Sequence, residues 1–75
     1  MAQGWNLKFT RPNPKGGADL QGLIVVHVAD QYNAVVMATS KMQDAVFTID
    51  SEASVGSLAE HDVKPGQMLV LVEGH

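Results

Sequence analysis

The chain contains no cysteine, and it has only 75 residues. Disulfides, thiolate zinc sites, iron–sulfur clusters and cysteine nucleophiles are therefore excluded. Because a chain this short supports one core, we expect residues 1–75 to form a single small domain. Its stability must come from packing alone, so each buried side chain should matter to the fold.

Hydrophobic periodicity predicts a fold built largely of strands. Residues 5–10 alternate apolar and polar side chains, which is typical of a half-buried strand with Trp5, Leu7 and Phe9 on one face. Later segments rich in β-branched and aliphatic residues predict further strands, of which the first is expected to be central and covered on both faces: residues 22–28, 45–49 and 68–73.

The segments between these strands predict one long loop, a turn and at most two short helices. Prolines and glycines in residues 11–17 predict the loop, and Pro65-Gly66 matches the second and third positions of a type II turn. Residues 34–38 fit either a strand or a short helix, because the two valines favour the first and the spacing of the alanines favours the second. Residues 54–62 predict one or two helical turns with Ser57 as the N-cap.

Four to five short strands with one or two short helices predict a mainly β protein, a β-rich α+β chain folded as a small, partly open β-barrel. Its core is expected to contain the large apolar side chains of the strands: Trp5, Phe9, Ile24, Val26, Val28, Phe47, Ile49, Leu69 and Leu71.

Charge is distributed unevenly along the chain. Lys8, Arg11 and Lys15 lie in the first 15 residues, which contain no acid, whereas the remainder carries all eight acidic residues and the net charge is −3. Nucleic-acid affinity depends on a basic surface that releases counterions, so the acidic remainder predicts no nucleic-acid partner.

No run of about 18 apolar residues is present, which predicts no membrane span. The first residues show no signal-peptide pattern, so we expect a cytoplasmic protein, or a virion component if the source is viral.

Sequence motifs for catalysis are missing. The chain has no phosphate-binding loop, dinucleotide fingerprint, H-E-x-x-H or G-x-S-x-G motif, so we expect no enzymatic activity and no catalytic residues. His27 lies within an apolar run, where a structural histidine is the expected role, and the three histidines predict no metal site. No cofactor is expected from these residues.

Two families share local patterns with this chain. Residues 4–7 are similar to a carboxylate-binding loop of the G-Φ-G-Φ kind, and residues 8–10 to the ligand-pairing strand that follows it. Residues 43–50 resemble the strand motif G-D-x-I-x-x-I-D/N, and residues 57–72 a final helix, Pro-Gly turn and strand. These segments resemble PDZ domains, and the resemblance implies binding of a peptide C-terminus beside a sheet edge.

The rival resemblance is to biotinyl and lipoyl carrier domains. Residues 34–46 are similar to the hairpin that displays the modified lysine, with Lys41-Met42 in register, and residues 62–73 to the closing strand. This resemblance implies modification of Lys41, with biotin or lipoate as the cofactor.

A third prediction follows from a general likeness to OB-like barrels and to small viral accessory or capsid-decorating proteins. It describes a non-catalytic protein-interaction module, or a small accessory or assembly subunit, that docks on a larger protein through a sheet edge; a viral decoration or inhibitor protein is its variant. Pairing of such an edge between copies of the chain would instead give a homo-oligomer. The first strand is the expected docking edge, with these partner-binding residues: Trp5, Asn6, Leu7, Lys8, Phe9 and Thr10.

Overall fold

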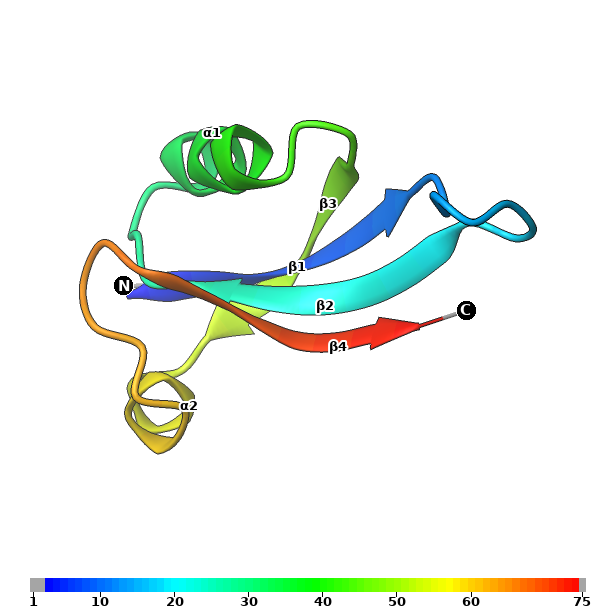
Figure 1. Cartoon of the computed structure of the whole chain (residues 1–75). Coiled ribbons are helices and arrows are strands. Elements are labelled where there is room, and N and C mark those ends of the chain that lie inside the picture. The colour runs from blue at the N-terminus through cyan, green and yellow to red at the C-terminus, as the bar shows by residue number, and fades with distance from the viewer. Residues whose placement is uncertain (1–2, 75) are drawn as a thin grey trace.

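The computed structural model describes residues 3–74, which fold into one four-stranded antiparallel sheet with two helices (Figure 1). The strand order across the sheet is β3-β1-β2-β4. In chain order the elements are β1 (Gly4–Arg11), β2 (Leu20–Val26), α1 (Gln31–Lys41), β3 (Val46–Ala53), α2 (Val55–Glu60) and β4 (Met68–Gly74).

The sheet is open. β3 and β4 form its two edges, and these edges do not pair with each other in the described part of the chain. The α+β class with few strands and two short helices is confirmed, whereas the prediction of a partly open barrel is wrong. A barrel would require the two edge strands to pair. Instead, a helix covers each face of the sheet: α1 packs on β1 and β3, and α2 lies on the other side (Figure 1).

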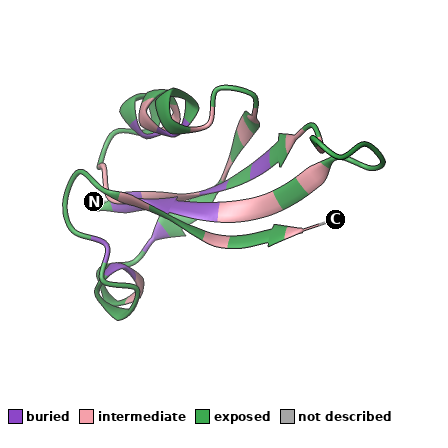
Figure 2. Ribbon diagram, in the orientation of Figure 1, coloured by how far each residue is buried: buried purple, intermediate pink, exposed green. Residues whose placement is uncertain are grey.

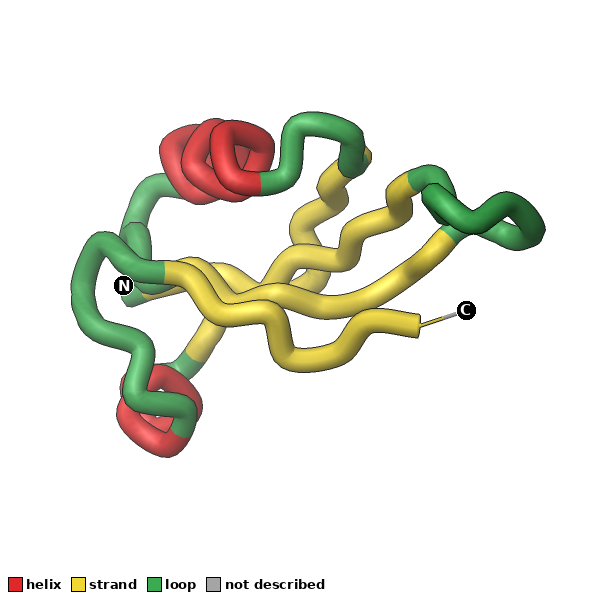
Figure 3. Tube along the Cα trace, viewed as in Figure 1, coloured by secondary structure: helices red, strands yellow, loops and turns green. Residues whose placement is uncertain are grey.

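β1 and β2 form a hairpin whose loop extends beyond the sheet (Figure 3). The predicted loop is confirmed, and Gly16 and Gly17 both adopt positive φ there. Register pairs Leu7 with Ile24 and Phe9 with Gly22, so Leu7, Phe9 and Ile24 share one face of the sheet.

α1 resolves the ambiguous segment 34–38 as helix. Asp30 begins the helix as its N-cap, where a carboxylate oxygen accepts a hydrogen bond from the Asn33 backbone N–H at 3.0 Å. Ala34 and Ala38, one helical turn apart, are both fully buried against the sheet. Burial of this narrow alanine face therefore outweighs the β preference of the two valines.

α2 begins one turn earlier in the chain than the predicted cap. Ser54 is the N-cap, and its hydroxyl accepts a hydrogen bond from the Ser57 backbone N–H at 3.0 Å, so the prediction of Ser57 as the cap is wrong. After α2, the Pro65-Gly66 turn is confirmed: Gly66 has φ +81°, and the Gln67 N–H donates to the Lys64 carbonyl.

Gly56 lies inside α2, where a glycine weakens a helix. An added methyl group at this position would meet only the Ser54 hydroxyl, at 4.0 Å. Gly56→Ala is therefore expected to raise the free energy of unfolding by about 0.5–1 kcal/mol, measured by urea denaturation. A lower stability would contradict the position of Gly56 within α2.

Two apolar clusters pack on opposite faces of the sheet (Figure 2). The α1 face contains Leu7, Phe9, Ile24, Val26, Ala34 and Ala38. The α2 face contains Val25, Ala53, Leu58 and Val63. Alternation along β2 sends neighbouring residues to opposite clusters, which confirms that this strand is covered on both faces.

The predicted core is correct in part. Phe9, Ile24 and Val26 are buried. Five other predicted core residues are half-buried: Trp5, Val28, Phe47, Ile49 and Leu71. Leu69 is exposed, so its assignment to the core is wrong; β4 is an edge strand, and this side chain is covered from one side of the strand only.

Candidate functional site

The predicted docking strand, β1, lies inside the sheet. β2 pairs with one side of it and β3 with the other, so its backbone groups are already bonded along both sides. The prediction that β1 is a sheet edge is therefore wrong for the whole predicted set: Trp5, Asn6, Leu7, Lys8, Phe9 and Thr10. Alternation along this segment reveals its buried face, but it carries no information on the number of neighbouring strands.

Most side chains of β1 are also engaged within the protein. Leu7 and Phe9 are buried in the α1-face cluster. The Trp5 indole Nε1–H donates a hydrogen bond to the Ala29 carbonyl at 2.9 Å, which joins β1 to the segment before α1. These three residues therefore maintain the fold.

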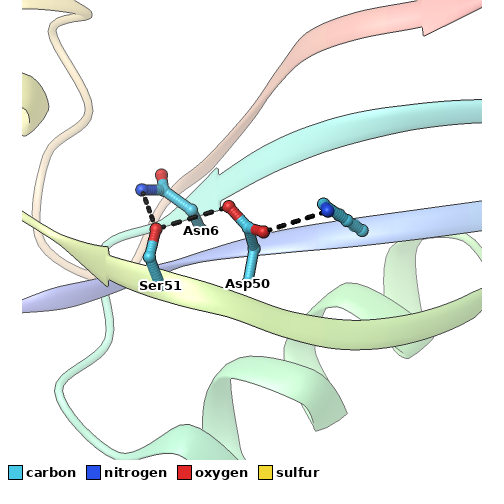
Figure 4. A network of polar contacts seen from close by, with 4 residues as sticks. Asn6, Asp50 and Ser51 are labelled. Atoms are coloured by element: carbon cyan, nitrogen blue, oxygen red, sulfur yellow. Dashed lines mark hydrogen bonds and ion pairs between the residues drawn. The ribbon is translucent and has the colours of Figure 1, made fainter.

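Two polar side chains of β1, Asn6 and Lys8, join a network with β3 (Figure 4). Asn6 Nδ2 donates to Ser51 Oγ at 3.1 Å, and Ser51 Oγ donates to Asp50 Oδ2 at 3.4 Å. Lys8 Nζ lies 3.3 Å from Asp50 Oδ1. Asp50 is the extra residue of a β-bulge, because Asn6 pairs with Ser51 and Leu7 with Ile49. The network orients the bulge, and as an exposed ion pair it adds little stability.

The local geometry that each family resemblance implies is not formed. Residues 4–7 are part of β1 rather than a loop, so they leave no free carboxylate-binding loop. Lys41 ends α1 rather than occupying a hairpin tip, because residues 31–41 are helical. Modification of Lys41 and binding of a peptide C-terminus remain predictions from the sequence.

His27 has the structural role expected of it. Its Nδ1 lies 2.8 Å from the Val63 carbonyl oxygen, so the ring links the end of β2 to the segment before β4. Within residues 3–74, no three histidine or acidic side chains gather closely enough to hold a metal ion. His75 lies outside the described residues. In the same part of the chain, no helix is long and apolar enough to cross a membrane.

The two free edges of the sheet differ in chemistry. β3 carries Asp50 and Glu52 along its edge, and such charges discourage pairing with another strand. β4 carries no charge from Met68 through Val72, and Leu69, Val70 and Val72 are 40%, 44% and 57% exposed. An uncharged edge with exposed aliphatic side chains is the type of edge to which another strand adds.

A groove of about 450 Å³ runs between the end of α1 and the β4 edge. Its lining comes from two segments that are far apart in sequence, and the main residues are Met37, Lys41, Met42, Gln67, Met68 and Val70. Two other hollows are of similar volume: one surrounds Leu23 on the opposite face, and one lies beside His27 and α2. The groove along α1 is the one whose lining includes residues of the uncharged β4 edge.

Sequence reasoning did not find this groove. Met37, Met42 and Met68 are half-buried: they pack against the α1-face cluster and also line the groove. The one available signal was the run of aliphatic residues in β4 without an intervening charge, which also fits a buried strand.

Comparison of the chain with protein-family models, with curated proteins and with solved structures found no match. The functional argument therefore depends on the geometry of the β4 edge and its groove.

Proposed function

We propose that this protein is a non-catalytic interaction module, acting as a small accessory or assembly subunit, that binds an extended segment of a larger protein at the β4 edge. The observation that carries the proposal is an uncharged, aliphatic edge strand lying beside an open apolar groove. Strand addition combines these features, because backbone hydrogen bonds supply affinity and neighbouring pockets supply specificity.

The backbone of β4 has groups available for such pairing. The His27 N–H donates to the Gln67 carbonyl at 2.8 Å, so this carbonyl points toward β2, and the N–H of the same peptide unit, that of Met68, points away from β2. Antiparallel partners alternate between bonded and non-bonded pairs, so the N–H and C=O groups of Met68 and Val70 point to the open side. Their side chains line the groove. At Met68 and Val70, an added strand could therefore form backbone hydrogen bonds and also place its side chains in the groove.

A bulge limits the length of this pairing. Ile24 pairs with Val70 and Leu23 with Val72, which leaves Leu71 as an extra residue. Beyond the bulge, Glu73 is bonded to Arg11, whose Nε and Nη2 both lie 2.7 Å from Glu73 Oε2. The accessible part of the edge is therefore short and lies at the α1 end of β4.

The test uses a displayed library of random octapeptides, joined to the carrier protein at both ends, selected against the folded chain. We expect enriched peptides to change the NMR amide shifts of β4 and of the end of α1. Val70→Pro should leave the fold intact, because proline is tolerated where an edge N–H faces solvent, and should weaken binding at least about tenfold.

Val46→Pro provides the matched control, since Val46 is an exposed valine at the start of the opposite edge strand and should leave binding unchanged. If Val70→Pro does not fold, Val70→Lys serves instead, because a lysine on an edge opposes strand addition. Failure to enrich any peptide, or amide shift changes confined to residues outside β4 and α1, would overturn the proposal.

A further inference from the structure

Lys41 is the one charged residue that lines the groove between α1 and β4. Its side chain is exposed, and within residues 3–74 it forms no ion pair, whereas Lys8 and Arg11 are paired with Asp50 and Glu73. A chain with net charge −3 thus presents a positive site beside its most apolar edge.

We infer that the segment bound at β4 carries an acidic side chain that meets the Lys41 ammonium, flanked by apolar side chains that enter the groove. This inference rests on the proposed function and names the chemistry of its partner. Unlike charges across an interface fix register and exclude wrong partners, even where they add little affinity.

The methionines of the groove indicate which residues of the bound segment lie beside its acidic residue. Met37, Met42 and Met68 contribute flexible, polarizable side chains, which adapt to apolar groups of different shapes. The groove therefore selects apolar character rather than one particular side chain, and Lys41 supplies the directional contact.

The acid is inferred to be a side chain rather than a chain terminus. A terminal carboxylate is held by backbone N–H groups gathered in a nest. At the turn beside this groove the Gly66 N–H donates to the His27 carbonyl at 2.9 Å, and the Gln67 N–H donates to the Lys64 carbonyl at 3.0 Å. Both donors are engaged, which leaves the Lys41 ammonium as the charged donor beside the groove, and a single ammonium suits the side-chain carboxylate of an internal Asp or Glu.

A second copy of this chain does not meet these requirements. Its acidic edge is β3, where Asp50 is already bonded to Lys8 and Ser51. Glu52, the other acid of that edge, has Asp50 and Ser54 two positions away, so no apolar side chains flank it on the same face of the strand. Pairing β3 of one copy with β4 of the next is also heterologous, so it would build an open-ended array rather than a closed dimer. The inferred occupant is a segment of a different protein.

The experiment repeats the octapeptide selection with wild type, Lys41→Glu and Lys64→Glu. Lys64 is an exposed lysine of the adjacent turn that does not line the groove, which makes it the matched control. Wild type and Lys64→Glu are expected to enrich Asp or Glu at one position beside apolar residues, and Lys41→Glu to enrich Lys or Arg at that position. An acidic peptide selected on wild type should bind Lys41→Glu about 3- to 30-fold more weakly, with a smaller difference at high salt.

The outcomes separate this inference from the proposed function. Peptides that bind at β4 and are sensitive to Val70→Pro, but show no acidic position or keep it in Lys41→Glu, would overturn the inference and leave the docking edge standing. Enrichment solely from a second library with free C-termini would overturn it in favour of terminal recognition. Concentration-dependent dimers in sedimentation, abolished by Val70→Pro, would replace the inferred partner with a second copy. Binding that is insensitive to Val70→Pro would overturn the proposed function itself.

Discussion

Phe9→Ala is expected to lower the free energy of unfolding by about 3–5 kcal/mol. The Phe9 ring is 2% exposed and packs against Phe47, with ring centroids 6.2 Å apart. Removing it deletes the largest fully buried side chain of the α1-face cluster and leaves a cavity beneath the helix. A domain of this size has a total stability of about 4–11 kcal/mol, so the variant should lose a quarter or more of it, and a protein at the lower end of this range would unfold at room temperature. Urea denaturation followed by circular dichroism measures the change.

Tyr32→Ala is the matched control, because it also removes an aromatic ring, and Tyr32 is 74% exposed on α1. We expect it to change the stability by about 0.5 kcal/mol or less. If both substitutions have equally small effects, the packing described for β1 is wrong. If Phe9→Ala does not fold, Phe9→Leu, which removes less of the buried side chain, takes its place and should still destabilise the protein more than Tyr32→Ala does.

Gly22→Ala is expected to destabilise the protein by about 3 kcal/mol, although it adds only one methyl group. A Cβ at this position would overlap the Val72 backbone carbonyl and approach the Phe9 ring to 2.7 Å. The carbonyl belongs to the neighbouring strand of the sheet and cannot move without disturbing the β2–β4 pairing. Thermal unfolding should therefore show a melting temperature lower by roughly 12–24 °C.

Gly74→Ala controls for the general effect of alanine in a strand, because nothing lies within 4 Å of a Cβ added at that position. Its stability should stay close to that of the wild type or rise slightly. Adding Phe9→Leu to Gly22→Ala should not restore stability, since the contact with the Val72 carbonyl remains. Full rescue by this second substitution would show that the ring, and not the close approach of β4, determines the need for glycine.

The proposed docking surface follows from the different chemistry of the two edges of the sheet. β3 combines charges with the cover of α1, whereas β4 combines exposed aliphatic residues with an adjoining groove. The proposed partner segment would add a neighbouring strand to the β4 edge. Its apolar side chains would cover the three half-buried methionines of the groove. Stability and binding should respond to different residues: Phe9 and Gly22 for the first, Val70 and Lys41 for the second.

Some features of this protein were determined by the sequence itself, because their causes are local. The alternation of Trp5, Leu7 and Phe9 placed these side chains on one face of a strand, as the structure shows. The Pro65-Gly66 pair specified the turn before β4, since proline sets φ at the second turn position and glycine accepts the positive φ at the third. The β-branched run in β2 specified a strand covered on both faces.

The tertiary structure alone decided which strands are neighbours, and therefore which strands form the edges of the sheet. β1 became central because β3, more than 35 residues further along the chain, pairs with its second side. The segment around Ala34 became a helix because the sheet offered a surface that buries two alanines one turn apart. Periodicity reports which side of an element is buried, but strand order depends on contacts between distant segments, which compete for the same backbone groups. For this reason the sequence pointed to β1 as an edge strand, whereas the folded sheet has β3 and β4 as its edges.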